Sequence, residues 1–270
     1  MRTAMTAMTA KTAMTALTAT AAAAALLLAA AGCGATPTSR AFASGGDDGA
    51  VSEVDPDAAP PSVDRVSVIG TVHDAVTTNT VAGATICVFE DPSRCTTSAA
   101  DGTFTLDGVP SASSGVVVDA SGYATGLWAM TASAPRVALA IRPADHATAW
   151  ARALGTTFDS TSTTGALAFS VVDGAGDPFV GATVTTTPAG RIGFFAGPGG
   201  GIDGTLTMTA SPGGGWVYDL PSGTVGVGVT APGKTCTRLS VFGWAPTAAG
   251  ETLAAPVRAG EVSIVRVACE

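Results

Sequence analysis

The sequence predicts an all-β protein with two tandem β-sandwich domains, which follow a disordered tether and are joined by one short connector helix. Three observations lead to this prediction. Short apolar segments recur about every 8–12 residues, with Gly, Asp and Pro turns between them. The motifs of residues 65–142 return, with drift, about a hundred residues later. The composition is 46% hydrophobic and 13% charged, with 34 glycines in 270 residues, which favours short strands over disorder.

The charge balance excludes one class of partner. The formal net charge is −8, and removal of Arg2 and Lys11 with an export segment leaves 11 basic residues against 21 acidic ones, or −10. Such a chain is repelled by phosphate backbones, and no stripe of basic residues occurs. We therefore expect no nucleic-acid partner. The glycine runs lack the lysine of a phosphate-binding loop, so we expect no cofactor either.

Residues 1–32 have the three parts of an export signal. Arg2 and Lys11 lie in a repetitive Met-Thr-Ala segment, an Ala/Leu run occupies 21–31, and small residues precede Cys33. The apolar run is shorter than the ~20 residues that span a bilayer. The sequence therefore predicts export.

The triplet Ala30-Ala31-Gly32 before Cys33 resembles the lipobox of bacterial lipoproteins, although that family prefers Leu where Ala30 stands. The resemblance implies cleavage before Cys33, lipidation of Cys33 and a membrane partner reached through the lipid. Because Gly34 rather than Asp follows, it implies the outer membrane, on its periplasmic or cell-surface face. A plain signal peptide with an incidental cysteine is the alternative. Residues 33–64, rich in Gly, Ala, Ser, Pro and Asp, are expected to form a disordered linker.

The first sandwich is expected over 65–142. Apolar residues alternate from Val66, a second strand follows Gly83, and Asp-Pro-Ser-Arg at 91–94 predicts a type I turn. Phe104 and Leu106 alternate inward after an Asp-Gly turn, and further strands are expected at 116–118 and 137–141.

A succession of motifs gives this segment a specific resemblance. The motifs are Gly-x-Val-x-Asp at 70–74, Gly-Ala-Thr-Ile at 83–86, Asp-Gly-Thr-Phe at 101–104, Val-Pro at 109–110 and Ser-Gly-Tyr at 121–123. Their order resembles the carboxypeptidase regulatory-like domain, whose fold is a transthyretin-like, Ig-like Greek-key sandwich. In metallocarboxypeptidases this domain is an appendage without catalytic residues, so the resemblance implies no peptidase activity.

Residues 143–164 are expected to form a connector that contains a helix. Asp145 is predicted to cap this helix, which runs through Leu154 and ends at Gly155. Its expected apolar stripe, made of Ala149, Trp150, Ala153 and Leu154, either packs on a neighbouring module or binds a partner.

The second sandwich, 165–270, is a divergent copy of the first. Val-Val-Asp at 171–173, Gly-Ala-Thr-Val at 181–184 and Gly-Trp-Val-Tyr-Asp-Leu-Pro at 215–221 match motifs of the first module. A Gly-rich insertion at 189–214 is expected to form a mobile or extended hairpin.

After Cys33, two cysteines fall in each module, which predicts one disulfide per module: Cys87 with Cys95, and Cys236 with Cys269. Zinc-bound or free thiols are the alternative, but no C-x-x-C spacing occurs and the two histidines lie in different regions. We therefore expect no metal site.

No constellation of catalytic residues is recognisable, so we expect no enzyme activity and no catalytic residues. His73 and His146 are not placed beside a serine, and Asp74, Asp101 and Asp173 are expected in turns. Two functions remain open. One is an envelope lipoprotein with a structural or protein-interaction role, including that of an accessory subunit of an envelope enzyme or transporter. The other is a glycan-binding module that uses Trp128 and Trp244 as stacking surfaces; Trp216 aligns with Phe104 and is expected in the core.

Overall fold

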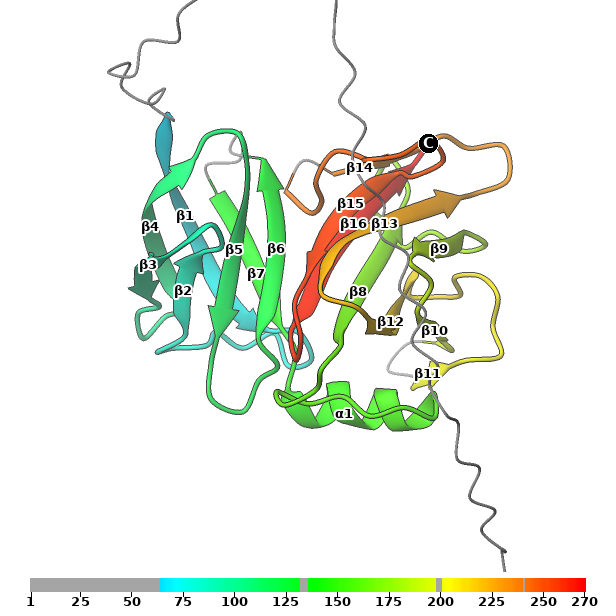
Figure 1. Cartoon of the computed structure of the whole chain (residues 1–270), viewed down its shortest axis with the longest axis horizontal. Helices are drawn as coiled ribbons and strands as arrows, with labels where there is room; N and C mark the ends of the chain where they lie inside the picture. Colours follow the sequence, from blue (N-terminus) through cyan, green and yellow to red (C-terminus); the bar gives the residue numbers. More distant parts are fainter. Residues whose placement is uncertain (1–63, 132–135, 198–200, 240) are drawn as a thin grey trace, which may run out of the picture. The chain divides into compact units, whose positions relative to one another are not determined.

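A computed structural model describes residues 64–131, 136–197, 201–239 and 241–270 (Figure 1). The expected signal segment, Cys33 and nearly all of the expected linker lie outside these residues. The described part is built of β-strands and one α-helix, which confirms the all-β fold class. We call the strands before the helix the first module and those after it the second module.

The first module contains seven strands, in two layers. The strands are β1 (Arg65–Asp74), β2 (Thr85–Val88), β3 (Asp91–Thr97), β4 (Thr103–Pro110), β5 (Ser113–Asp119), β6 (Gly126–Thr131) and β7 (Arg136–Ile141). One layer is a small sheet of order β4-β1-β7, in which β7 runs parallel to β1. The other layer has the order β6-β5-β2-β3. Alternating side chains such as Ile86, Leu106 and Val118 fill the core between them.

The second module contains nine strands, also in two layers. The strands are β8 (Gly165–Val172), β9 (Thr183–Thr187), β10 (Arg191–Phe195), β11 (Ile202–Asp203), β12 (Gly214–Leu220), β13 (Gly223–Thr230), β14 (Cys236–Arg238), β15 (Leu253–Val257) and β16 (Val262–Cys269). A small sheet of order β15-β13-β9 packs on the layer that contains β12, β8 and β16. The expected insertion forms β10 and β11, an antiparallel pair that extends the second layer.

The two modules share one continuous sheet of ten strands, which we call the long sheet (Figure 1). It forms because β16 of the second module pairs in parallel with β6 of the first, with Ile264 opposite Trp128. Trp128 and Ile264 face the first core, whereas Val265, the next residue along β16, faces the second core. Because successive side chains of a strand point to opposite faces, the two cores lie on opposite faces of the long sheet.

The connector helix α1 (Ala144–Ala153) packs on the long sheet and differs in detail from the expectation. The residue at its N-cap is Pro143, and Asp145 lies in the first turn without capping the helix through its side chain. There the carboxylate still interacts favourably with the helix dipole. Gly155 follows the helix with a φ of +73°, the left-handed conformation expected at a helix end.

The expected apolar stripe of the helix was partly wrong. Ala149 and Ala153 are exposed, and the residues that face the sheet are Ala147, Ala151 and Leu154, with Trp150 partly buried. Small residues stand at the contact because Trp216 and Tyr218 already fill the space on the sheet below. The helix is therefore a packing element of this chain.

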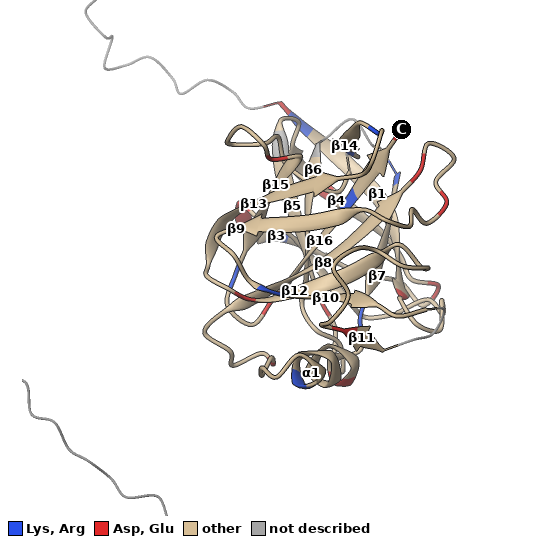
Figure 2. Ribbon diagram, turned by 90° about the vertical axis from the view of Figure 1, so that its right-hand side faces the viewer, with Lys and Arg blue, Asp and Glu red and all other residues tan. Residues whose placement is uncertain are grey.

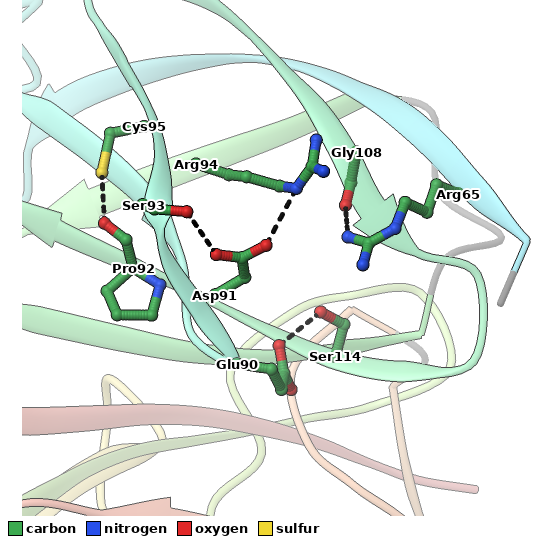
Figure 3. A network of polar contacts seen from close by, with 9 residues as sticks. All are labelled: Arg65, Glu90, Asp91, Pro92, Ser93, Arg94, Cys95, Gly108 and Ser114. Atoms are coloured by element: carbon green, nitrogen blue, oxygen red, sulfur yellow. Dashed lines mark hydrogen bonds and ion pairs between the residues drawn. The ribbon is translucent and has the colours of Figure 1, made fainter. Parts of the chain in front are cut away.

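The expected turn at 91–94 lies two residues earlier, at Phe89–Glu90. Residues 91–94 begin β3, where the Asp91 carboxylate accepts hydrogen bonds from Ser93 Oγ (2.6 Å) and Arg94 Nε (2.9 Å) (Figure 3). Glu90 Oε2 accepts a hydrogen bond from Ser114 Oγ (2.8 Å), as the same figure shows. This tie holds the hairpin turn against β5.

A buried hydroxyl occupies the same place in both modules, a correspondence that the aligned motifs did not show. Ser98 Oγ accepts a hydrogen bond from Ala84 N (2.9 Å) and donates one to Val81 O (2.8 Å). The corresponding atoms of the second module are Thr209 Oγ1, Ala182 N (3.0 Å) and Phe179 O (2.8 Å). Each hydroxyl fixes the entry into the second strand of its module.

Removal of either hydroxyl is expected to destabilise the protein. Ser98→Ala and Thr209→Val each leave a buried backbone N–H without its partner, at a cost of about 1–3 kcal/mol in the free energy of unfolding. Thr103→Val is a matched control, because its hydroxyl bonds Asp101 at an exposed site and its loss should cost less than about 0.5 kcal/mol. Urea unfolding measures all three; equal losses for Ser98→Ala and Thr103→Val would contradict the role of the buried hydroxyl.

Candidate functional site

A groove runs along the open edge of β7, between the first small sheet and the long sheet. Its larger part has a volume of about 450 Å³, and an adjoining part of about 180 Å³ continues toward the helix. Ala140, Ser170 and Ile264 line both parts, so the two are continuous. Strand β7 forms one wall, and β8 and β16 of the long sheet form the floor. The larger part has the size of an ordinary ligand pocket, ~300–1,000 Å³.

The backbone of β7 leaves hydrogen-bonding groups free on the groove side. Ile141 O accepts a hydrogen bond from Ala75 N (2.9 Å), which continues the pairing with β1. Backbone groups of alternate residues in a parallel strand point to the same side, so those of Ala138 and Ala140 point away from β1. No described strand pairs with this edge of β7. Two N–H and two C=O groups therefore face the groove.

Three arginines line the groove in a protein that is otherwise acidic. Arg136 begins β7, Arg142 directly follows it, and Arg266 belongs to β16. Among the described residues, none of the three forms a salt bridge. The acidic residues are spread over turns, loops and strands of the described chain (Figure 2), and one of them, Asp74, attracts Arg142. The groove is therefore a local concentration of positive charge.

Arg142 is held in place by an aromatic ring. Its guanidinium carbon lies 4.8 Å from the centre of the Trp150 ring, a cation–π contact. Burial lowers the pKa of Arg142, and attraction to Asp74 opposes this shift. An arginine remains charged at neutral pH under these conditions. The end of the groove next to the helix therefore carries a fixed positive charge.

Asp74 has the structural role expected from its turn motif. Its Oδ1 accepts hydrogen bonds from Val76 N (2.6 Å) and Thr77 N (2.8 Å), and its Oδ2 accepts one from the Tyr123 hydroxyl (2.9 Å). Burial alone would raise the pKa of Asp74, but these hydrogen bonds outweigh it and hold the pKa below its ordinary value. The carboxylate thus ties the Ser-Gly-Tyr turn to β1.

The carboxylates of the other two expected turns are bound in the same local way. Asp101 Oδ1 accepts a hydrogen bond from Thr103 N (3.0 Å). Asp173 Oδ1 accepts hydrogen bonds from Ala175 N and Asp177 N, both at 2.9 Å. These aspartates therefore act in turns, as expected.

Both expected disulfides are present. Cys87 lies opposite Cys95 on β2 and β3, and Cys236 lies opposite Cys269 on β14 and β16. Cysteines in disulfides do not supply the thiolates that zinc requires. Among the described residues, no three His, Cys, Asp or Glu side chains gather where they could hold a metal ion. The disulfides indicate that the chain folds in an oxidising, extracytoplasmic compartment.

The tryptophans differ from the expectation at one of the two proposed stacking positions. Trp128 is completely buried in the first core, so its assignment as a ligand-stacking surface was wrong. It lies on β6 (Gly126–Thr131), a strand that the sequence pattern did not predict. Trp244 is partly exposed; its Nε1 donates a hydrogen bond to Ser114 O (3.0 Å) and its ring packs edge-on against Phe89. Trp216 is buried, as expected.

Glu261 is a half-buried carboxylate in the β15–β16 turn. One of its oxygens is buried without a hydrogen-bond partner. Burial raises the pKa of Glu261 and repulsion from Asp119 adds to this, whereas attraction to Arg258 opposes it. Because the unfolded chain loses this proton at a lower pH than the folded chain, stability falls as the pH rises from the unfolded-state pKa to the folded-state pKa, and the full loss persists above the folded-state pKa.

Glu261→Gln is expected to raise the melting temperature at pH 7, and the gain should disappear near pH 4, about the pKa of an unfolded Glu. Glu251→Gln is a control of opposite sign. A hydrogen bond from Thr247 N (2.8 Å) helps to lower the pKa of Glu251, so its charge stabilises the fold at neutral pH and less as the pH falls. Thermal unfolding of both variants at pH 4 and pH 7 tests the pair; a loss of stability in Glu261→Gln at pH 7 would contradict this assignment.

Comparison with family models supports the resemblance of the first module. Residues 67–138 match the model of the carboxypeptidase regulatory-like domain, from β1 into β7. The match covers one module, and the kinship of the second module rests on the internal repeat. A search among curated proteins found no matching sequence. In the described residues, no helix is both long and apolar enough to cross a membrane.

Solved structures with partial similarity include several bacterial pilins. The Bacillus anthracis TIE protein is 15% identical with a TM-score of 0.23 over 76% of this chain, which spans only 34% of that protein. The minor pilin GBS52 of Streptococcus agalactiae is 12% identical (TM-score 0.26; 75% of this chain, 94% of that one). The major pilin subunit BcpA of Bacillus cereus is 9% identical (TM-score 0.23; 77% and 99%). TM-scores this low do not establish a shared overall fold.

Proposed function

We propose that this chain is a non-catalytic envelope protein, anchored at the outer membrane through a lipid on Cys33, that presents its two modules to a protein partner as one rigid unit. The observation that carries the proposal is the junction between the modules. Beside the β6–β16 pairing, Val262 N donates a hydrogen bond to Thr125 O and Gly243 N donates one to Ala129 O, both at 2.9 Å. Backbone ladders of this kind oppose hinge motion between modules.

Side chains reinforce the same junction. Arg258 donates a hydrogen bond from Nη2 to Phe89 O (3.1 Å), and its guanidinium carbon lies 3.9 Å from the centre of the Phe89 ring. Trp244 packs edge-on against the same Phe89 ring, and its Nε1 donates a hydrogen bond to Ser114 O. Domains joined only by a linker commonly move relative to each other, so a junction built in this way favours a role that depends on fixed geometry.

The polar groups of the groove favour binding over catalysis. Arginines and free backbone groups supply charge and hydrogen bonds, whereas covalent or acid–base catalysis needs an activated nucleophile or a positioned base. His73 lines the groove, and in the described chain it makes no side-chain hydrogen bond to a Ser, Thr or Cys. His146 packs edge-on against Trp150 instead.

The anchoring part of the proposal is tested by mass spectrometry and membrane fractionation. The mature protein should begin at an acylated Cys33 and sediment with the outer membrane, and Cys33→Ala should appear in the soluble fraction. Ser39→Ala, in the same segment, serves as a control that should remain bound. A mature protein that begins elsewhere and is released from membranes would contradict the anchor.

The interaction part is tested by affinity capture with the full lipidated chain from a solubilised envelope. A protein partner at stoichiometric yield, identified by reciprocal capture, is the expected result. Polysaccharide without protein, lost in Trp244→Ala, would overturn the proposal in favour of glycan binding. Turnover of a captured substrate would contradict the non-catalytic assignment.

A further inference from the structure

We propose that the groove binds an extended, carboxylate-bearing peptide segment of a partner protein, which adds to β7 as a further strand. This inference rests on the proposed function, because it names the chemistry of the partner that the envelope protein would present itself to. It is carried by three features of the groove: its free backbone edge, its small-residue walls and its arginines.

The free edge of β7 is open to strand addition. Ala138 and Ala140 direct two N–H and two C=O groups into the groove, and an added strand would satisfy them. Natural proteins usually protect such an edge with Lys, Pro, a bulge or a covering segment. Inside β7 the sequence Val-Ala-Leu-Ala has none of these residues, and its pairing with β1 is continuous without a bulge.

The walls and floor leave space for a backbone. Ala140 of the wall and Ser170 of the floor, which line both parts of the groove, have small side chains. Beyond them the floor is apolar, with Ile264 and Phe242. A strand bound there would place alternate side chains against this floor, which favours small or apolar residues at every second position.

The arginines of the groove favour a ligand with negative charge. Arg136 is the first residue of β7, which has six residues, and Arg142 directly follows its last residue. At about 3.3 Å per residue, the Cα atoms of these two arginines are roughly 20 Å apart. Arg266, on β16, also lines the groove, and its Nη2 donates a hydrogen bond to Gly176 O (3.3 Å). Partner carboxylates near both ends of a segment of about six residues would meet these cations, and electrostatic complementarity of this kind gives specificity.

The test uses a capped synthetic octapeptide with Glu near each end and alternating Val and Thr between them. Binding to the full chain with its disulfides formed is measured by calorimetry and by backbone hydrogen exchange. The acidic peptide should bind about tenfold or more tightly than its Lys counterpart. It should also slow exchange of the Ala138 and Ala140 amides. The inference is overturned if both peptides bind equally, or if the acidic peptide slows hydrogen exchange only at amides outside β7. Neither outcome needs a variant.

Two variants separate strand addition from simple charge attraction. Ala138→Pro removes a groove-facing N–H but none that bonds β1, and proline is tolerated on a strand edge; it should weaken binding about tenfold or more. Arg136→Glu should weaken binding and reduce its salt dependence, whereas Arg152→Glu, on the exposed face of α1, should leave it unchanged.

Other occupants give distinct results. If glutarate binds as tightly as the peptide, the groove is an anion site and strand addition is overturned. The same follows if N-methylation of the peptide at alternate residues leaves its affinity unchanged. If the peptide fails but an envelope protein is captured equally by wild type and Ala138→Pro, the proposed function stands and this inference falls. Capture that is lost in Ala138→Pro, with exchange protection at β7, supports both.

Discussion

Trp216→Ala is expected to lower the free energy of unfolding by about 3–5 kcal/mol, the typical cost of removing a fully buried large aromatic side chain. Trp216 is 1% exposed and lies between the long sheet and helix α1. Its ring stacks on Tyr218 (centroids 5.5 Å apart) and meets Trp150 edge-on at 5.3 Å. Alanine would leave a cavity, since the helix residues that face it, Ala147 and Ala151, are too small to fill the space.

Urea unfolding measures this effect, and two variants bracket it. Trp216→Phe keeps an aromatic ring and should cost less than the alanine variant. Trp244→Ala removes a partly exposed ring and one hydrogen bond, so it should also cost less. A loss below about 1 kcal/mol in Trp216→Ala would show that the helix does not depend on this ring, because a buried tryptophan normally contributes several times more.

Features encoded by local chemistry were predicted from the sequence. Gly83 and Gly181 open the second strand of each module with φ values of +71° and +91°, which explains why the Gly-Ala-Thr motif survives in both copies. The cysteines were paired correctly, because each pair lies within one module. The helix end at Gly155 followed from the same left-handed conformation.

Features that depend on distant pairing were not predicted. Strand β6 contains Leu127 and Trp128, which are both buried on opposite faces, so its apolar residues do not alternate and the strand gave no period-two signal. Its partner β16 begins at Val262, far along the chain, and no local motif reports that contact. For the same reason the sequence did not reveal the groove, because its wall and floor come from different modules.

Removal of the Cys236–Cys269 disulfide is expected to cost more than removal of Cys87–Cys95. In the chain-entropy account, a disulfide stabilises by restricting the unfolded chain, and the effect grows with the closed loop. The sequence separations are 33 and 8 residues, which give about 3.7 and about 2.5 kcal/mol. Paired Cys→Ala variants of each bridge, compared by urea unfolding, measure the difference.

The location of the bridges should increase this difference. Cys269 is buried at the end of β16, the strand that pairs with β8, β6 and β14 and so joins the two modules. Cys95 lies on β3, an edge strand of the long sheet. Loss of the C-terminal bridge should therefore also speed hydrogen exchange in β16 and at the junction, whereas loss of the hairpin bridge should affect β2 and β3 alone. If the hairpin bridge proves the more costly to remove, loop length does not govern stability here, and β16 is held in the junction by its strand pairing without help from the disulfide.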